Sequence, residues 1–223
     1  MKIFMRVLRL GRIVMPVDLN LQKEGMIYQR EQYRKGGIGR WYWDYRDRAI
    51  LKLVGDKKII ADIGCGEGML LEKMIRKFPA AKVFGIDPSP ENRRICKERG
   101  LEVYNGSVYN LELDDASVDC ILFVEVVEHL KDEGLAMKEI RRVLKKDGAL
   151  VLLFPHDSIF KLTRILTFKF REAFYDAGHV KQWTPEAMEK LLDSSGFEII
   201  FKKNLPFYLW MTSLHCLLVA KKL

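Results

Sequence analysis

The sequence of 223 residues contains only four cysteines and seven prolines. The cysteines, at positions 65, 96, 120 and 216, have neither the paired spacing of a disulfide framework nor the spacing of a metal site. Cys120 and Cys216 stand in apolar, strand-like runs, which indicates buried thiols in a reducing compartment. We therefore expect a cytoplasmic protein that has no metal site.

A long apolar run is also missing. No stretch approaches the roughly 20 apolar residues that a membrane-spanning helix needs. The first residues are apolar and basic, but Arg6, Arg9 and Arg12 interrupt any signal-peptide core. We expect no transmembrane segment, and both Met1 and Met15 are candidate sites for the start of translation.

The basic residues are not clustered along the sequence. The net charge of +8 comes from 38 Lys and Arg against 30 Asp and Glu, without a long basic run or an appended RNA-binding module. One interpretation is an acidic partner, such as nucleic acid or phospholipid headgroups. The other is the Lys-, Arg- and Glu-rich surface of many heat-adapted proteins. Because basic residues are scattered through most expected helices, we favour the second interpretation, and nucleic acid is the less favoured partner.

Apolar residues are plentiful, at 48% of the chain, which is enough for one sizeable core. Periodicity predicts helices near 41–54, 68–78, 90–99, 133–145 and 185–195, and strands near 57–62, 82–87, 101–104, 118–124, 149–154, 197–203 and 214–222. This alternation predicts an α/β fold with a doubly wound, mostly parallel sheet. Within a single domain we expect an N-terminal extension and helical lid over 1–54 and a main unit over 55–223, with an insertion over 155–183.

The segment 59–71, IIADIGCGEGMLL, is the most informative part of the chain. An apolar run ends in Asp62, glycines follow at positions 64, 66 and 68, and apolar residues at helical spacing come next. This order predicts a buried strand, a tight turn and a helix N-terminus, with a backbone that a nucleotide or nucleoside could approach closely. Met69 stands where a dinucleotide fingerprint needs its third glycine, so we do not expect a dinucleotide ligand.

A second acidic residue follows the next expected strand. Asp87 ends the run KVFGID, and Pro88 stops the strand. A carboxylate accepts two hydrogen bonds from neighbouring hydroxyl groups, so Asp87 is suited to hold a ribose diol.

Further motifs follow in a recognisable order. Asn105-Gly106-Ser107-Val108 comes first, then the segment 111–130 with Glu125 and the triplet Glu-His-Leu at 128–130, then Arg142–Val151. From about Trp41 to Gly196 this succession resembles the class I S-adenosylmethionine-dependent methyltransferases of the small-molecule type. The resemblance implies a seven-stranded sheet with an antiparallel last strand, and S-adenosylmethionine as cofactor.

The resemblance also implies roles for individual residues. The glycine turn would open the main chain to the cofactor, Asp62 would orient its methionine amine, and Asp87 would hold its ribose. Ser107 stands where relatives often have an Asp that receives the adenine amino group, so we expect a weaker contact or a substitute there. The expected cofactor residues are Asp62, Gly64, Cys65, Gly66, Gly68, Asp87, Pro88, Gly106, Ser107, Val108, Glu125 and Trp41.

Two segments outside the core are candidates for a lid. The segment 28–48 contains Trp41-Tyr42-Trp43-Asp44-Tyr45-Arg46, which is similar to a family segment that covers the cofactor; an aromatic helix packed on the sheet is an equally good interpretation. The segment 156–183 alternates aromatic and basic residues, and could grip an anionic or lipid-like acceptor. For this second segment we favour an ordinary amphipathic cover helix.

The catalytic base is the least determined part of the site. Histidine suits proton transfer at neutral pH, and His129 and His179 are the main candidates, ahead of His156. We expect a methyltransferase that acts on a small-molecule or lipid-like acceptor by in-line displacement. An RNA methyltransferase and a non-catalytic cofactor-binding protein are the alternatives, and the sequence leaves the oligomeric state open.

Overall fold

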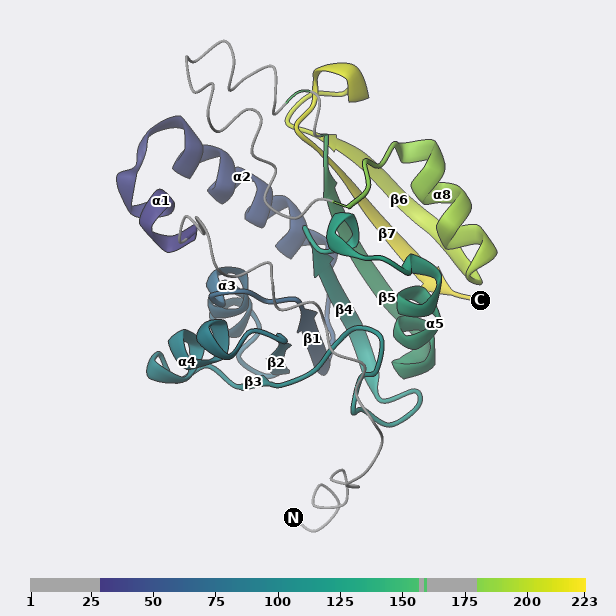
Figure 1. The fold of residues 1–223 in the computed structure, drawn as a ribbon, viewed down its shortest axis with the longest axis horizontal. Helices are drawn as coiled ribbons and strands as arrows, with labels where there is room; N and C mark the ends of the chain where they lie inside the picture. Colours follow the sequence, from purple (N-terminus) through teal and green to yellow (C-terminus); the bar gives the residue numbers. More distant parts are fainter. Residues whose placement is uncertain (1–28, 157–158, 160–179) are drawn as a thin grey trace.

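The computed structural model describes residues 29–156, 159 and 180–223 of the chain (Figure 1). Its centre is a seven-stranded sheet in the order β3-β2-β1-β4-β5-β7-β6. Strands β1 to β5 are parallel, and β7 runs antiparallel to both β5 and β6. The strands are β1 (Ile59–Ile63), β2 (Lys82–Ile86), β3 (Val103–Tyr104), β4 (Val118–Val124), β5 (Leu144–Pro155), β6 (Phe197–Leu205) and β7 (His215–Lys222). The predicted seven-stranded α/β fold with an antiparallel last strand is confirmed.

Helices cover both faces of this sheet (Figure 1). They are α1 (Gln29–Lys35), α2 (Gly37–Leu53), α3 (Met69–Lys77), α4 (Pro90–Glu98), α5 (Glu133–Val143) and α8 (Pro185–Ser194), with short 3-10 turns η2 (Val127–His129) and η3 (Trp210–Thr212). Local sequence explains where α8 begins, because Thr184 accepts a hydrogen bond from the Ala187 N–H and Pro185 occupies the first helical position. None of the helices in the described ranges is long and apolar enough to cross a membrane.

The apolar core forms two layers, one on each face of the sheet. Met137, Ile140 and Met188 belong to the layer that α5 and α8 cover. Ile50 of α2 and Met74 of α3 are fully buried in the other layer. Helix α2 is thus part of the core as well as of the predicted N-terminal lid region, while the domain boundary at residue 54 stays a prediction.

Some predicted bounds are wrong for reasons of tertiary pairing. The strand predicted at 149–154 begins at Leu144 instead, because Leu144 already pairs with Val118 of β4 before the register shifts. The turn-like sequence Lys146-Asp147-Gly148 therefore lies within β5. The helix predicted at 41–54 begins at Gly37, and α1 precedes it, with Gly36 between the two helices at a φ of +74°.

Candidate functional site

The glycine turn between β1 and α3 has the positive φ angles that the sequence predicts. The φ values of Gly64, Gly66 and Gly68 are 74°, 54° and 71°. A Cβ atom on Gly64 would lie 2.5 Å from Val126 Cγ2, and one on Gly68 would lie 2.6 Å from Leu101 Cδ1. At Gly66 the nearest atom would be Gln29 Oε1, at 3.8 Å. Gly64 and Gly68 are therefore required by the packing of the fold, whereas the space above Gly66 is open.

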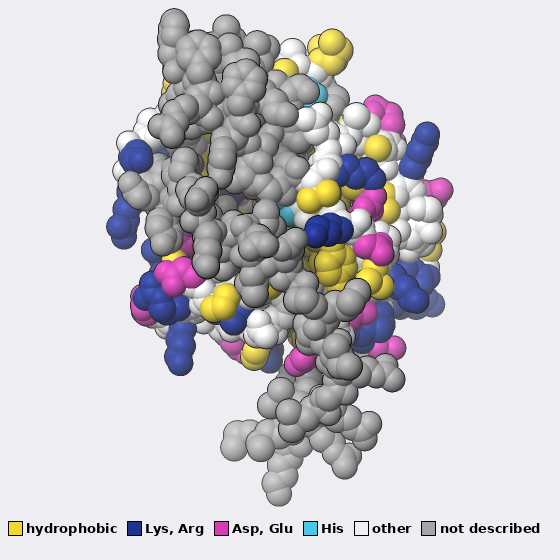
Figure 2. All heavy atoms as spheres, in the orientation of Figure 1, with side chains coloured by type: hydrophobic (Ala, Val, Ile, Leu, Met, Phe, Trp, Pro, Cys, Tyr) yellow, Lys and Arg dark blue, Asp and Glu magenta, His cyan; other side chains and the backbone are white. Residues whose placement is uncertain are grey.

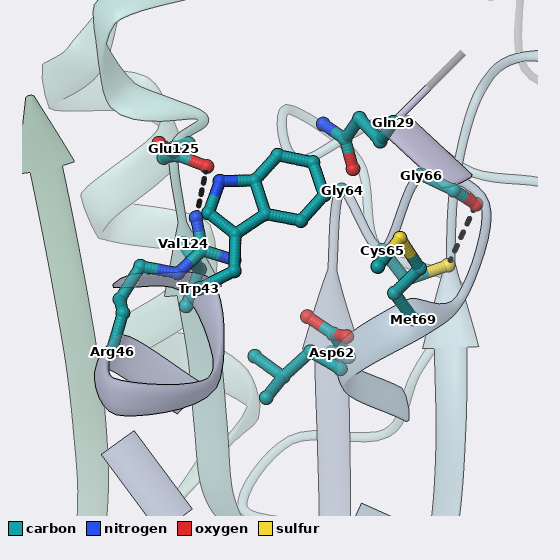
Figure 3. A pocket seen from close by; sticks show the side chains of 11 residues that line it. Gln29, Trp43, Arg46, Asp62, Gly64, Cys65, Gly66, Met69, Val124 and Glu125 are labelled. Carbon is teal, nitrogen blue, oxygen red and sulfur yellow. Dashed lines mark hydrogen bonds and ion pairs between the residues drawn. The ribbon is translucent and has the colours of Figure 1, made fainter. Parts of the chain in front are cut away.

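A pocket of about 500 Å³, continuous with solvent, lies beside this turn. It is formed between α2 and the carboxyl ends of β1 and β4, where ligands bind in open α/β sheets. Trp43 stands on one side of the pocket, and Gln29 of α1 faces it from the other (Figure 3). The lining residues are Gln29, Trp43, Arg46, Asp62, Gly64, Cys65, Gly66, Met69, Leu70, Val124 and Glu125.

Asp62 is a buried carboxylate that faces this pocket (Figure 3). Its exposed fraction is 3%, and its side chain accepts no hydrogen bond from the described residues. Burial, with the negative charges of Asp87 and Asp47, raises the pKa of Asp62 to about 7, against the opposing effect of Arg46. A buried carboxylate without a partner favours a cationic ligand group, which would stabilise its charge.

Asp87, at the end of β2, holds the glycine turn in place. Its Oδ2 accepts a hydrogen bond from the Gly66 N–H at 2.8 Å, and its Oδ1 accepts one from the Ser89 N–H at 2.9 Å. Asn92 donates a third hydrogen bond at 3.2 Å. Asp87 is only 4% exposed, so it orders the turn in addition to any contact that it makes with a ligand.

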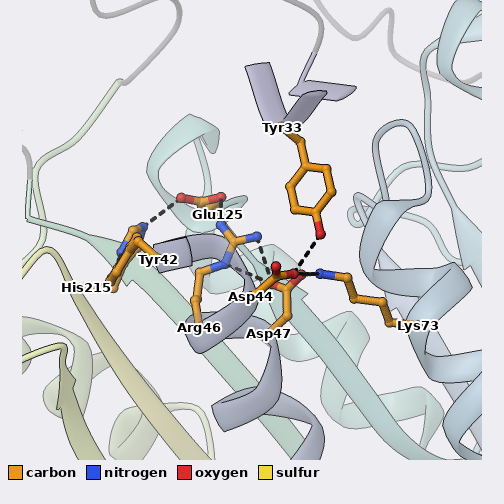
Figure 4. Close-up of polar contacts among 8 residues, drawn as sticks. All are labelled: Tyr33, Tyr42, Asp44, Arg46, Asp47, Lys73, Glu125 and His215. Carbon is orange, nitrogen blue, oxygen red and sulfur yellow. Dashed lines mark hydrogen bonds and ion pairs between the residues drawn. The ribbon is translucent and has the colours of Figure 1, made fainter. Parts of the chain in front are cut away.

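Glu125 follows β4 and presents a second carboxylate to the pocket. Its backbone has a φ of 56°, which is uncommon for a residue other than glycine. Arg46 Nη1 donates to its Oε2, and His215 Nε2 lies against its Oε1, both at 2.7 Å (Figure 4). Burial raises the pKa of Glu125, but Arg46 and His215 outweigh burial and hold this pKa well below its usual range. Glu125 is therefore ionised and anchored from both sides.

These contacts belong to a longer polar network, seen in Figure 4. On one side, Tyr42 OH lies 2.6 Å from His215 Nδ1. On the other side, Asp47 accepts a hydrogen bond from Arg46 at 3.0 Å and another from Lys73 at 2.8 Å. Lys73 continues to Asp44 at 2.8 Å, and Tyr33 donates to the same Asp44 oxygen at 2.8 Å. The network ties α1 and α2 to α3, to the end of β4 and to the start of β7.

Known proteins share both the sequence motifs and this fold. Residues 61–152 match the family model described as "Methyltransferase domain". The ubiquinone biosynthesis O-methyltransferase of Pelagibacter ubique is 31% identical over 169 residues, which cover 72% of this chain and 66% of that protein. A probable S-adenosylmethionine-dependent methyltransferase of Mycolicibacterium smegmatis is 25% identical over 71% of this chain and 60% of its own length.

Solved structures agree with this fold. A methyltransferase of Thermotoga maritima, described as a possible histamine N-methyltransferase, superposes with a TM-score of 0.69 at 22% identity, over 89% of this chain and 96% of that one. The chain belongs to the class I S-adenosylmethionine-dependent methyltransferases. It spans 66% and 60% of the length of the two curated relatives given above.

The pocket fits the cofactor of this methyltransferase family. The unpartnered Asp62 carboxylate and the ionised Glu125 face a cavity beside the open backbone of Gly66. S-adenosylmethionine carries an amine and a sulfonium, both cationic, and the aromatic face of Trp43 attracts such charge. Asp62, Glu125 and Trp43 would therefore hold the methionine half of the cofactor.

The other predicted cofactor residues of the methyltransferase differ in whether they line this pocket. Cys65 lines the pocket. Pro88 and the loop residues Gly106, Ser107 and Val108 do not, and they lie near the ends of β2 and β3, where the adenosine half was expected. Trp41 is 57% exposed and stacks on Tyr45 at 5.8 Å. The pocket receives Trp43 instead, because the two tryptophans project from different sides of α2. The cofactor contact of Trp41 stays a prediction.

Of the candidate bases of the methyltransferase, the two that the structure describes, His129 and His156, do not line the pocket. His129 ends η2 and is half-buried, and His156 follows β5. His179 lies outside the described residues. The assignment of a base therefore stays a prediction.

Sequence reasoning missed several residues of this site. Arg46 belongs to the aromatic motif at 41–46 and could have been suspected from it. His215 lies in an apolar strand, 90 residues from Glu125, and has no local signal. Gln29 reaches the site because its N–H donates to Glu67 Oε1 at 2.8 Å, which brings α1 over the glycine turn.

Proposed function

We propose that the protein transfers a methyl group from S-adenosylmethionine to a hydroxyl group of a small molecule. The narrower form of this proposal is that the small molecule is lipid-like. The observation that carries this proposal is the pocket with two carboxyl side chains, the ionised and anchored Glu125 and the buried Asp62 with its raised pKa, beside the open backbone at Gly66. Such a pocket suits a ligand with two cationic groups. Relatives named ubiquinone biosynthesis O-methyltransferase support an oxygen acceptor.

The cofactor supplies an electrophilic methyl group when it is bound. A hydroxyl acceptor would take this methyl group in exchange for its proton, which would leave to a base or to solvent. Trp43 and the wall made by α1 and α2 would restrict the approach of the acceptor to the reacting atoms. The lowered pKa of Glu125 makes it a poor proton acceptor. Glu125 instead positions cationic groups, and His129 or His179 is the proposed base.

A transfer assay tests this proposal directly. The full chain is incubated with methyl-labelled S-adenosylmethionine and with separate fractions of polar metabolites, lipid extract and RNA. We expect label in the metabolite or lipid fraction, and no label with a Gly66→Val variant, whose side chain would enter the pocket. Label in RNA alone would establish the RNA alternative. Binding of the cofactor without transfer to any fraction would establish the non-catalytic alternative.

The non-catalytic alternative has a structural counterpart. A structure described as the [4+2]-cyclase SpnF superposes with a TM-score of 0.65 at 19% identity, over 80% of each chain. A protein of this fold can therefore be named for a reaction other than methyl transfer. For the RNA alternative, the described residues that are visible in Figure 2 intersperse Lys and Arg with Asp and Glu, and they form no continuous basic track.

A further inference from the structure

The hairpin between β6 and β7 exposes a group of large apolar side chains. Phe207, Tyr208, Leu209 and Met211 are 59%, 94%, 70% and 79% exposed. We call residues 207–211 the apolar tip; apolar side chains project at the upper edge of the molecule in Figure 2, above the end of β6. Proteins seldom expose contiguous apolar groups unless these groups meet a partner or a membrane.

Polar side chains at the base give the apolar tip a fixed shape. The Ser213 hydroxyl lies 2.8 Å from the carbonyl oxygens of both Phe207 and Leu209, and Asn204 Nδ2 donates to the Tyr208 carbonyl at 2.7 Å. Ser213 is fully buried. The backbone carbonyls of Phe207, Tyr208 and Leu209 thus have hydrogen-bond partners from Asn204 and Ser213, while the side chains of these three residues are exposed. Hydrogen bonds therefore hold the backbone of the tip in a conformation that exposes apolar side chains.

A basic groove, open to solvent, lies between α2 and the edge formed by β6 and β7. Among the described residues that line it, the charged ones are Arg48, Lys52 and Lys203, and none is acidic. Arg48 and Lys52 continue a stripe along α2 that begins with Trp41 and Tyr45, since positions i, i+4, i+7 and i+11 share one helix face. The full lining is Tyr45, Arg48, Ala49, Lys52, Leu53, Phe201, Lys203 and Leu217.

The groove and the apolar tip are neighbours. Leu205 and His215 pair at the base of the hairpin that carries the tip. Tyr42 of α2 stacks on the His215 ring at 5.6 Å, and its hydroxyl donates to the Leu205 carbonyl at 3.4 Å. Lys203, which lines the groove, lies on β6 four residues before Phe207, so the groove and the tip share this hairpin. We call the stripe, Lys203 and the apolar tip together the docking face.

We propose that the docking face binds the surface of a membrane that contains anionic phospholipids. The apolar tip would enter the acyl region, Trp41 and Tyr45 would lie at headgroup level, and Arg48, Lys52 and Lys203 would meet the phosphates. An acidic protein partner would match the three cations but would leave the apolar tip without a counterpart. This inference does not depend on the proposed reaction, because none of these residues lines the cofactor pocket.

Vesicle flotation of the full chain tests the proposal. We expect wild-type protein to float with vesicles of phosphatidylglycerol and phosphatidylcholine, to bind pure phosphatidylcholine at least about tenfold more weakly, and to dissociate as salt rises from about 50 to about 500 mM. A Leu209→Ser, Met211→Ser variant should bind at least about tenfold more weakly, because two apolar side chains no longer enter the acyl region. An Arg48→Gln, Lys52→Gln variant should bind about 30-fold more weakly.

Matched controls lie on the α8 side of the sheet. Ile200 is 49% exposed on β6, and Lys190 is exposed on α8. Ile200→Ser and Lys190→Gln should leave vesicle binding unchanged, and every variant should keep its affinity for S-adenosylhomocysteine in calorimetry. Should a tip variant fail to fold, the comparison of anionic with neutral vesicles still decides the question for wild-type protein.

Three results would overturn the proposal. One is wild-type protein that does not float with anionic vesicles. Another is binding that the control substitutions weaken as much as the tip substitutions do. The third is a wild-type dimer in light scattering that the tip substitutions dissociate, since the docking face would then be an interface between two copies of this chain.

Discussion

His215 Nε2 lies 2.7 Å from Glu125 Oε1, a contact between the first residue of β7 and the residue that follows β4. His215 is 1% exposed, whereas the Glu125 side chain is 29% exposed and lines the cofactor pocket. The histidine therefore acts through Glu125 and not on the ligand itself. Together with Arg46, it fixes a carboxylate at the edge of the pocket without covering it.

The first prediction concerns Arg46. Its side chain is 10% exposed and pairs with both Glu125 and Asp47, so Arg46→Ala leaves Glu125 with His215 alone and Asp47 with Lys73 alone. We expect a loss of about 3–5 kcal/mol in the free energy of unfolding. Arg40→Ala, on the same helix, removes a 54% exposed side chain that is 4.0 Å from Asp44 and should cost less than about 1 kcal/mol. Urea unfolding of both variants measures the difference; equal losses would contradict it.

The second prediction concerns pH and ligand binding. Since the pKa of Asp62 is raised to about 7, the carboxylate is mostly protonated below that pH in the free protein. Affinity for S-adenosylhomocysteine, whose amine is cationic, should rise by up to about tenfold per unit as pH increases towards 7, and then level off. Asp62→Asn should bind weakly without this rise. Calorimetry from about pH 5 to 8.5 provides the test, and an identical slope in the variant would refute the role of Asp62.

The same pKa has a consequence for stability that can be measured without ligand. Between its ordinary pKa of 3.8 and about 7, Asp62 keeps its proton in the folded state and loses it in the unfolded state. The unfolded state binds fewer protons in this window, so this group makes the folded state less stable as pH rises, by on the order of 4 kcal/mol in total. Asp62→Asn should lack this decline. Chemical denaturation of both proteins across the window gives the comparison.

The third prediction separates two glycines of one turn. Gly64→Ala would bring a Cβ atom to 2.5 Å from Val126 and should lower the free energy of unfolding by at least about 2 kcal/mol. Gly66→Ala meets no atom closer than 3.8 Å, so it should cost only the backbone strain of about 1–2 kcal/mol. Its methyl group would nonetheless stand where the cofactor approaches. Gly66→Ala should thus fold and lose cofactor binding, and thermal melts with calorimetry would show whether the two effects separate.

The fourth prediction concerns Asp87. Asp87→Ala should weaken cofactor binding by about 1.5–3 kcal/mol if the carboxylate holds the ribose. It should also destabilise the fold, because the Gly66 and Ser89 N–H groups lose their acceptor. Asp193→Ala, an exposed change on α8, is the matched control and should alter neither quantity. Wild-type affinity in Asp87→Ala would show that the ribose lies elsewhere.

The sequence by itself determined the elements whose causes are local. The run 59–71 carries a strand, a glycine turn and a helix start in successive residues, and the structure has all three at those positions. Thr184 and Pro185 likewise fix the start of α8 through contacts within one helical turn. The family resemblance added the seven-stranded sheet and its antiparallel last strand, β7.

Only the tertiary structure decided which side chains meet in the pocket. Arg46 and His215 lie 79 and 90 residues from Glu125, and no local pattern relates positions at such separations. The choice of Trp43 over Trp41 depended on how α2 is rotated against the sheet, which Ile50 and Leu51 set by packing in the core. The space available for a side chain also differs between Gly64 and Gly66, and this difference depends on the positions of Val126 and Gln29, which are distant in the sequence. Periodicity records which face of an element is apolar, whereas the approach of distant side chains is settled by how the elements pack.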